Sequence, residues 1–363
     1  MDPPLRVLTV EHVIPRLPGF CALWDMEWIV LPALAAGAAA AGMFYQAVGA
    51  ARDRKRFTPP GLLAPVGTHR LHYVCEGTGG PAVVLDAGIA ASSLSWSRVR
   101  PLVARETRVC SYDRAGLAWS DAAPGVRSTD ALVNELRMLL DSAGIPPPYV
   151  LVGHSFGALV IRAFARAHPE EVAGLVFVDP LHPEEWCELS PHQRRMIRGA
   201  VSLSRLGSVL ARLGVVRFSL ALLSGGAPTA PRMFSRMLGP TAAALLEHLV
   251  GEVQKLPPEV LPAVQAHWSN PKAFRGMRQH LAAMSSCSAS LMKQSDSFGD
   301  MPVVVLSAGR RAPRWLATDA ALARASLRGR HLASPGSGHW IHLDDPELVS
   351  GAIRDVIAAV VHE

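Results

Sequence analysis

The sequence predicts an α/β protein with a mostly parallel sheet, and two observations carry this prediction. Short apolar runs recur through residues 65–180, and longer segments with helical periodicity separate them. This alternation is typical of βαβ units, which join parallel strands by right-handed crossovers. The alternation disappears over residues 181–300 and returns over 301–361. We therefore expect one α/β core, formed by 65–180 and 301–361, that is interrupted by an inserted helical cap.

The strands of this core are expected where the chain is continuously apolar, because a strand covered on both faces shows no alternation. The first expected strand alternates instead, as a half-buried strand does. The Pro/Gly-rich stretch Thr58–Gly67 before it is expected to be a linker. The expected strands are 69–77, 81–88, 107–113, 148–153, 172–179, 302–309 and 330–333.

The helices are expected where apolar residues recur at a spacing of three or four. One of them begins at a capping residue, Ser128 or Thr129, and stops at Gly144, and the next is ended by Pro169. The expected core helices are 95–106, 129–144, 155–169, 315–326 and 346–361.

The composition excludes several classes of protein. Hydrophobic residues make up 49% of the 363 residues and charged residues 18%, which excludes an intrinsically disordered chain. The net charge of +6 is modest, and the basic residues are dispersed rather than interleaved with aromatics, so we expect no nucleic-acid partner. The five cysteines form no CxxC pair and no zinc-type spacing with histidines, so we expect no metal site.

Residues 1–57 form a separate N-terminal segment with a candidate membrane anchor at 28–51. That stretch holds no charged residue, is long enough to span a bilayer, and is followed by the basic cluster Arg52–Arg56. The cluster favours a cytoplasmic position for the domain that follows it. The alternative is a surface-lying or partly buried, alanine-rich helix, because Pro32 and Gln46 weaken the apolar run. A signal peptide is disfavoured, because its basic residues would precede the apolar run.

The stretch GHSFG carries the clearest chemical signal. It fits the pattern G-x-S-x-G, with Ser155 between Gly153 and Gly157, and it joins an apolar strand to an amphipathic helix. A strand-to-helix turn this tight crowds its neighbours, and glycines relieve the clash. The helix N-terminus also favours developing negative charge. We therefore expect Ser155 to be a nucleophile.

A serine nucleophile needs a base, and the Gly-rich turn after the last strand offers His339. A loop at that edge of the sheet allows an imidazole to reach back over Ser155. His342, three residues later, leads into the final helix and is expected to be a surface or core residue.

Five motifs in order, LDAG, YDRAG, GHSFG, FVDP and GSGHWIHLDDPELV, resemble those of serine-dependent α/β-hydrolases of the lipase- and esterase-like branch with a helical cap. The resemblance covers residues 65–361 and implies the α/β-hydrolase fold. It also implies that the backbone N–H groups of Ile89 and Phe156 bind the tetrahedral oxyanion. The Asp113 carboxylate in YDRAG is similar to a structural turn of the family and is expected to be scaffolding.

The acid of the triad is the hardest residue to assign. The family commonly carries it just after the strand that follows the cap, but here that turn reads Ser307–Arg311, with arginines in place of a carboxylate. Asp179 ends the strand 172–179, where some relatives place their acid, and Asp319 lies within an expected helix. Because open α/β sheets build their sites at the carboxyl ends of strands, we favour Asp179. Asp319 stays open, as does a purely structural role for Asp179.

These residues predict hydrolysis of a carboxylic ester through an acyl-enzyme, with no metal or organic cofactor. A serine nucleophile argues against epoxide hydrolysis and dehalogenation, which use a carboxylate. The apolar, mildly basic cap favours a small or lipid-like uncharged substrate. The alternatives are an amide or peptide hydrolase resembling prolyl aminopeptidases, and a non-catalytic sensory protein on the same scaffold.

The strands that carry Cys75 and Cys110 are neighbours in the strand order of the family, which allows a disulfide. Two buried thiols are the favoured expectation. A bridge would argue for a domain outside the cytoplasm, against the charge-based topology.

Overall fold

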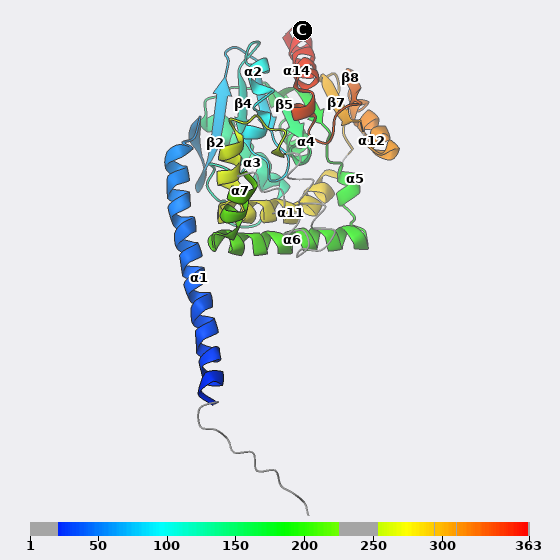
Figure 1. Ribbon diagram of the computed structural model, residues 1–363. Helices are drawn as coiled ribbons and strands as arrows, with labels where there is room; N and C mark the ends of the chain where they lie inside the picture. Colours follow the sequence, from blue (N-terminus) through cyan, green and yellow to red (C-terminus); the bar gives the residue numbers. More distant parts are fainter. Residues whose placement is uncertain (1–20, 225–252, 294, 310, 362–363) are drawn as a thin grey trace, which may run out of the picture.

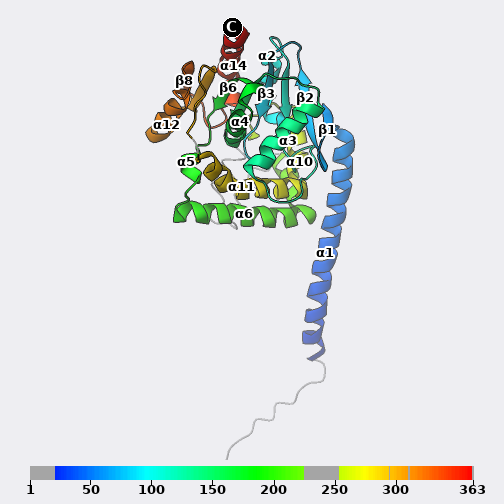
Figure 2. The same ribbon diagram turned by 180° about the vertical axis from the view of Figure 1, so that it is seen from behind.

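The computed structural model describes residues 21–224, 253–293, 295–309 and 311–361. A single sheet forms the centre of the molecule, helices cover both of its faces, and a further layer of helices lies across one end of the strands (Figures 1 and 2). The long helix α1 (Cys21–Arg56) projects from this body. The predicted fold class is confirmed.

The eight strands lie in the order β1-β2-β4-β3-β5-β6-β7-β8. Strands β1 and β2 pair antiparallel with each other, and β2 pairs antiparallel with β4, whereas all later pairs are parallel. The strand bounds are β1 Leu62–Val66, β2 His69–Glu76, β3 Ala82–Asp86, β4 Val109–Tyr112, β5 Tyr149–His154, β6 Val172–Val178, β7 Val303–Ala308 and β8 Gly329–Ser334.

One face of the sheet is covered by α3, α4 and α12, and the other by α2, α13 and α14. Their bounds are α2 Arg100–Val103, α3 Thr129–Ser142, α4 Phe156–Ala167, α12 Pro313–Ala323, α13 Ile341–Asp344 and α14 Pro346–Val361. Between β6 and β7 the chain forms α5 Pro183–Trp186, α6 Pro191–Arg212, α7 Val215–Ser224, α10 Leu261–Trp268 and α11 Pro271–Leu291. These five helices occupy the expected cap.

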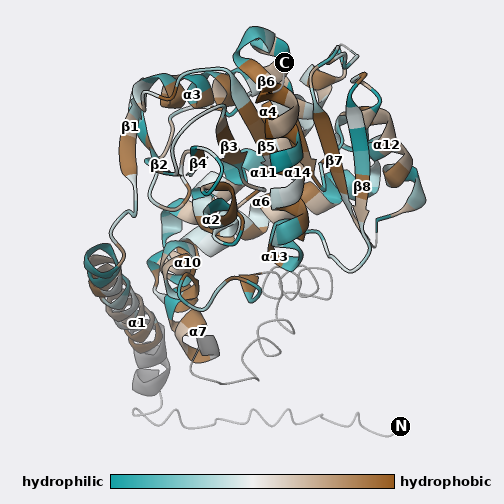
Figure 3. Ribbon diagram, turned by 90° about the horizontal axis from the view of Figure 1, so that it is seen from above, coloured by the Kyte–Doolittle hydropathy of each residue, from teal (hydrophilic) through white to brown (hydrophobic). Residues whose placement is uncertain are grey.

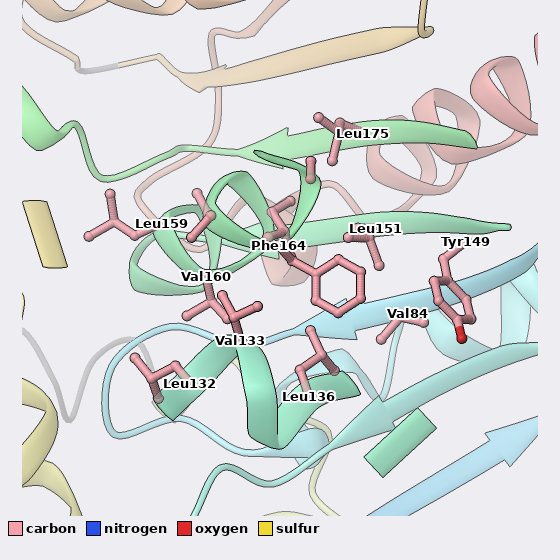
Figure 4. Close-up of a cluster of buried hydrophobic side chains, with 14 of the residues drawn as sticks. Val84, Leu132, Val133, Leu136, Tyr149, Leu151, Leu159, Val160, Phe164 and Leu175 are labelled. Atoms are coloured by element: carbon pink, nitrogen blue, oxygen red, sulfur yellow. The ribbon is translucent and has the colours of Figure 1, made fainter. Parts of the chain in front are cut away.

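The central strands are continuously apolar because both of their faces are buried. Every residue of β3, β5 and β7 is buried, and these strands stand out as hydrophobic in Figure 3. Figure 4 shows Val133 and Leu136 of α3 and Phe164 of α4 packed around Val84 and Leu151 of the sheet. This packing fixes the position of the turn at the end of β5.

Two expectations about the first half of the chain are wrong. The stretch Thr58–Gly67 is not a linker, because Leu62–Val66 forms β1 and pairs with β2. Pro65 is tolerated there because an edge strand needs no second ladder of hydrogen bonds. The expected helix at 95–106 is shorter, since a 3₁₀ turn at Ser93–Trp96 precedes α2, which starts next to Pro101.

Cys75 and Cys110 form a disulfide, so the expectation of two thiols is wrong. The two residues are register partners on the antiparallel strands β2 and β4, with Cα atoms 4.1 Å apart. Pairing of the two strands therefore brings the two cysteines close enough for a bridge. The sequence left this point open because strand order alone does not fix the register.

We expect the double variant Cys75→Ser/Cys110→Ser to lose about 2–4 kcal/mol of unfolding free energy, because the bridge joins residues 35 positions apart in the chain. Urea unfolding under non-reducing conditions measures the loss. Cys187→Ser, which removes a half-buried free thiol, is the matched control and should change stability little. Equal midpoints for the double variant and the wild type would contradict the bridge.

Candidate active site

Ser155 lies on a strained turn between β5 and α4. Its backbone has φ 52° and ψ −113°, outside the regions that L-residues usually adopt. The two glycines of GHSFG allow this turn: a Cβ at Gly153 would lie 2.7 Å from the backbone of Gly157, and a Cβ at Gly157 would lie 2.4 Å from the Asp86 carbonyl oxygen. The G-x-S-x-G pattern is therefore required by close backbone contacts.

We expect Gly157→Ala to lower stability by about 1–3 kcal/mol and to reduce activity, because the added methyl group displaces α4 from the end of β3. Thermal unfolding and ester hydrolysis measure the two effects. Gly199→Ala is the matched control, since nothing lies within 4 Å of a Cβ at that helical position. A Gly157→Ala protein as stable and active as the wild type would show that the contact is not required.

Backbone strain gathers around this turn. Four described residues other than glycine have positive φ, and three of them are Ala90 at 59°, Ser155 at 52° and Asp179 at 41°. Ala90 follows the turn after β3, Ser155 follows β5, and Asp179 follows β6. Such conformations persist where the surrounding structure holds them, and they cluster at functional sites.

The imidazole of His339 pairs with Asp179. Its Nδ1 lies 2.5 Å from Asp179 Oδ2, across 160 positions of sequence. The other carboxylate oxygen accepts hydrogen bonds from the Ala308 amide at 3.0 Å and from Arg311 Nη1 at 2.7 Å. The side chain of His339 is 38% exposed, so solvent or a substrate can reach the ring.

The surroundings keep Asp179 ionised. Burial opposes the charged form of this carboxyl group, but the hydrogen bond and charge of His339, followed by the charge of Arg311, outweigh it. The pKa of Asp179 consequently falls below its ordinary value of 3.8. An anionic carboxylate is suited to orient a neighbouring imidazole and to stabilise its protonated form.

The ring of His154 connects His339 to the nucleophile turn. His154 precedes Ser155, its Nε2 lies 2.9 Å from the His339 carbonyl oxygen, and the two rings lie 4.7 Å apart. Burial, with the nearby charges of His342 and His339, holds the pKa of His154 well below 6.5, so the ring is neutral. His342 was expected at the surface or in the core, and it lies in the core. Burial lowers its pKa to about 3.

Asp319 lies inside α12 and makes no contact with His339 among the described residues. It is fully buried and accepts hydrogen bonds from His182 Nε2 at 2.7 Å and from the Ser307 hydroxyl at 2.5 Å. Its Oδ2 also lies 2.8 Å from Arg311 Nε. Arg311 therefore bridges the two carboxylates that the sequence left as candidates.

The turn after β3 lies against the nucleophile. A Cβ at Gly88 would lie 2.8 Å from His154 Nδ1 and 3.5 Å from the Cβ of Ser155. Neither the Ile89 amide nor the Phe156 amide has an acceptor within the described part of the chain, and Phe156 is the first residue of α4. An oxyanion hole requires two such unengaged amides, both directed at the oxygen that becomes negatively charged.

Arg114 holds this turn, a role that the sequence did not reveal. Its guanidinium is buried, pairs with Asp86, and donates hydrogen bonds to the carbonyl oxygens of Ala87, at 2.5 Å, and Gly88. Because these carbonyls are engaged by Arg114, the turn has a fixed orientation. The only available signal was the position of this arginine in YDRAG.

Asp113 is scaffolding in the structure, away from Ser155. It accepts hydrogen bonds from the Ser93 amide at 2.7 Å and lies 2.8 Å from His72 Nδ1. Burial raises its pKa, but the hydrogen bond and charge of His72, with the contacts of Ser93, lower it below 3.8 overall.

A possible ligand set for a metal ion is found elsewhere in the described residues, where His168, Glu170 and Glu171 lie close together. These residues follow the last turn of α4, the end opposite to Ser155, and Glu171 pairs with Arg137 at 2.8 Å. The cluster has no part in the candidate active site.

The fold matches those of known proteins. The α/β hydrolase fold family matches residues 81–202, which run from β3 through the nucleophile turn into α6. A thermophilic esterase from Thermogutta terrifontis superposes with a TM-score of 0.57 at 22% identity, over 82% of this chain and 98% of that one. The chain therefore has the α/β-hydrolase fold. This likeness establishes the fold, whereas the reaction needs further argument.

The relatives of this chain give little direct information about its activity. YqjL of Bacillus subtilis, an uncharacterized protein, is 24% identical over 79% of this chain and 88% of its own length. A probable transporter of Hormonema carpetanum, efuK, is 37% identical over 125 residues, which make up 32% of this chain but 18% of that protein.

Proposed function

We propose that this α/β hydrolase is a serine esterase with Ser155 as nucleophile, His339 as base and Asp179 as the acid that orients the base. The observation that carries the proposal is the 2.5 Å pair between His339 and Asp179, next to the strained serine turn. A nucleophile, a base and an orienting carboxylate at the ends of three strands form the constellation of serine hydrolases.

In the proposed reaction Ser155 Oγ attacks the ester carbonyl while His339 Nε2 accepts the hydroxyl proton. The amides of Ile89 and Phe156 stabilise the oxyanion, and the positive end of the α4 helix dipole also favours its negative charge. His339 then returns the proton to the leaving alcohol, which leaves an acyl-enzyme. Water, deprotonated by His339, releases the acid and restores Ser155.

A profile of p-nitrophenyl esters of increasing chain length, set beside the matching p-nitroanilides, tests the proposed reaction class. We expect turnover of the esters and, at equal acyl length, a far lower kcat/KM for the anilides. Faster anilide cleavage would favour the amide or peptide hydrolase. Absence of turnover with every substrate would favour the non-catalytic alternative.

We propose that α1 anchors the protein in a membrane. Its segment Val30–Arg56 is long and apolar enough to cross a bilayer, and only 6% of its most apolar stretch is buried. A signal sequence near an N-terminus passes the same test of length and composition. Resistance of the full chain to extraction by alkaline carbonate, with an uncleaved N-terminus by mass spectrometry, tests the anchor.

The disulfide supports a position of the hydrolase domain outside the cytoplasm, because bridges persist in oxidising compartments. This proposal replaces the cytoplasmic position that the basic cluster favoured. Labelling of Lys293, near the end of α11, in intact cells by a membrane-impermeant amine reagent tests it. Labelling only after the cells are broken would show that the domain lies in the cytoplasm.

A further inference from the structure

Helix α1 packs against the cap through one part of its length, residues 42–53. Gly42 contacts the cap so closely that a Cβ there would lie 2.2 Å from the Leu213 carbonyl oxygen, between α6 and α7. Four residues later, Gln46 is buried and donates to the Ser269 carbonyl oxygen at 3.0 Å. Arg217 of α7 reaches Gln46 at 2.9 Å and Asp53 at 2.7 Å. These contacts fix the direction in which α1 leaves the body.

The stretch of α1 just before this contact is open to solvent among the residues that the structure describes. Residues 30–38 are all exposed, and they include the large apolar side chains of Val30, Leu31 and Leu34. Figures 1 and 2 show that this part of α1 continues past α6, away from the sheet, while α6 runs across the molecule at the level where α1 leaves the cap. A bilayer spanned by this part of α1 would therefore begin next to α6.

The exposed face of α6 is strongly basic. It carries five exposed arginines, and α6 contains no acidic residue. None of the five has an ion-pair partner among the described residues. Apolar side chains lie between them, with Leu206 at 46% and Val209 at 50% exposure. The five arginines are Arg194, Arg195, Arg198, Arg205 and Arg212.

This composition fits an anionic lipid surface. Guanidinium groups bind phosphate oxygens in a bidentate manner. A helix with arginines and scattered apolar residues on its outer face lies flat in the headgroup region, and anionic lipids strengthen its binding. The opposite face of α6 packs against α11. The outer face is consequently turned toward the side on which α1 emerges.

We propose that the arginine face of α6 docks on the anionic phospholipids of the bilayer in which α1 is anchored, so that the cap rests on the membrane. The proposal depends on the anchor proposed above but not on the identity of the reaction. It places the cap, which covers the carboxyl ends of the strands, between the sheet and the lipid surface.

A fluorophore on α6 tests this placement in the full chain, reconstituted into vesicles of phosphatidylcholine alone or mixed with phosphatidylglycerol. An environment-sensitive probe is attached through Leu206→Cys in the background Cys21→Ser/Cys187→Ser/Cys287→Ser. The control probe is Leu327→Cys, which is 84% exposed and precedes β8, at the opposite end of the strands. Lipids with a quencher in the upper acyl chain report contact with the membrane.

We expect a blue shift and quenching at position 206 in the mixed vesicles, weaker in phosphatidylcholine alone and reduced by high salt. Position 327 should show neither. Equal, water-like emission at both positions, in protein that resists carbonate extraction, would overturn the docking while leaving the anchor intact. A shift at 206 that depends on protein concentration in lipid-free detergent would indicate self-association instead, and it would also overturn the proposal.

Charge reversal gives an independent test. The variant Arg195→Glu/Arg198→Glu/Arg205→Glu should lose the blue shift and the dependence on anionic lipid. The matched control reverses three exposed arginines elsewhere, in Arg105→Glu/Arg324→Glu/Arg354→Glu, and should keep both. Unchanged melting temperature shows that each variant is folded. A shift that survives reversal on α6 would show that the arginines do not bind the lipid.

Discussion

Replacing Ser155 with alanine is expected to lower kcat/KM for a p-nitrophenyl ester by about 10³–10⁶-fold, because the Ser155 hydroxyl forms the bond to the ester carbonyl in the proposed reaction. The turn is held by the backbone contacts of Gly153 and Gly157, so the variant should fold normally. Activity is measured with purified protein, and thermal unfolding verifies the fold.

Ser350→Ala is the matched control for this experiment. Ser350 is fully buried in α14, where its hydroxyl donates to the Glu347 carbonyl oxygen at 3.1 Å, and α14 packs on the sheet face opposite to α4. Activity of this variant should stay within a few-fold of the wild type. If Ser155→Ala retained a tenth or more of the activity, another residue would have to be the nucleophile.

Replacing Asp179 with asparagine is expected to lower kcat by about 10⁴-fold, because the amide no longer stabilises the protonated imidazole of His339 and favours the wrong tautomer. Asp319→Asn should act mainly on stability. Its carboxylate is buried among His182, Ser307 and Arg311, and loss of its charge leaves Arg311 less well paired.

The two variants distinguish the candidate acids when kcat and unfolding are measured together. A large loss of kcat with Asp179→Asn, beside a modest one with Asp319→Asn in folded protein, would support the assignment. The reverse order would transfer the role of acid to Asp319. Equal small losses would favour the structural role for Asp179 that the sequence left open.

Most of the fold could be predicted from the sequence because the parallel strands are continuously apolar and the helices between them are amphipathic. The final helix begins at Pro346 and ends at Val361, as expected. The edge strand β1 was missed because Pro65 and the surrounding glycines are typical of a linker, and only pairing with β2 orders them. The disulfide depended on the register of β2 and β4.

The site could be predicted in part. Ser155 and His339 lie in local patterns that their chemistry requires, so a single sequence indicates them. The arginines that support the site could not be found this way. Arg114 acts on the turn after β3, and Arg311 acts on Asp179, through contacts between residues far apart in the chain. Arginine in a loop has no local pattern that distinguishes such contacts from exposure to solvent.

The most direct test of the account is labelling of the folded wild-type chain with a fluorophosphonate, followed by mass spectrometry of its peptides. We expect one adduct per chain, on Ser155, together with loss of ester hydrolysis in proportion to labelling. Prior unfolding should abolish the reaction, because the activation of Ser155 depends on His339 and the turn. Folded protein that fails to react at Ser155, or reacts equally well after unfolding, would contradict the assignment of Ser155 as the activated nucleophile.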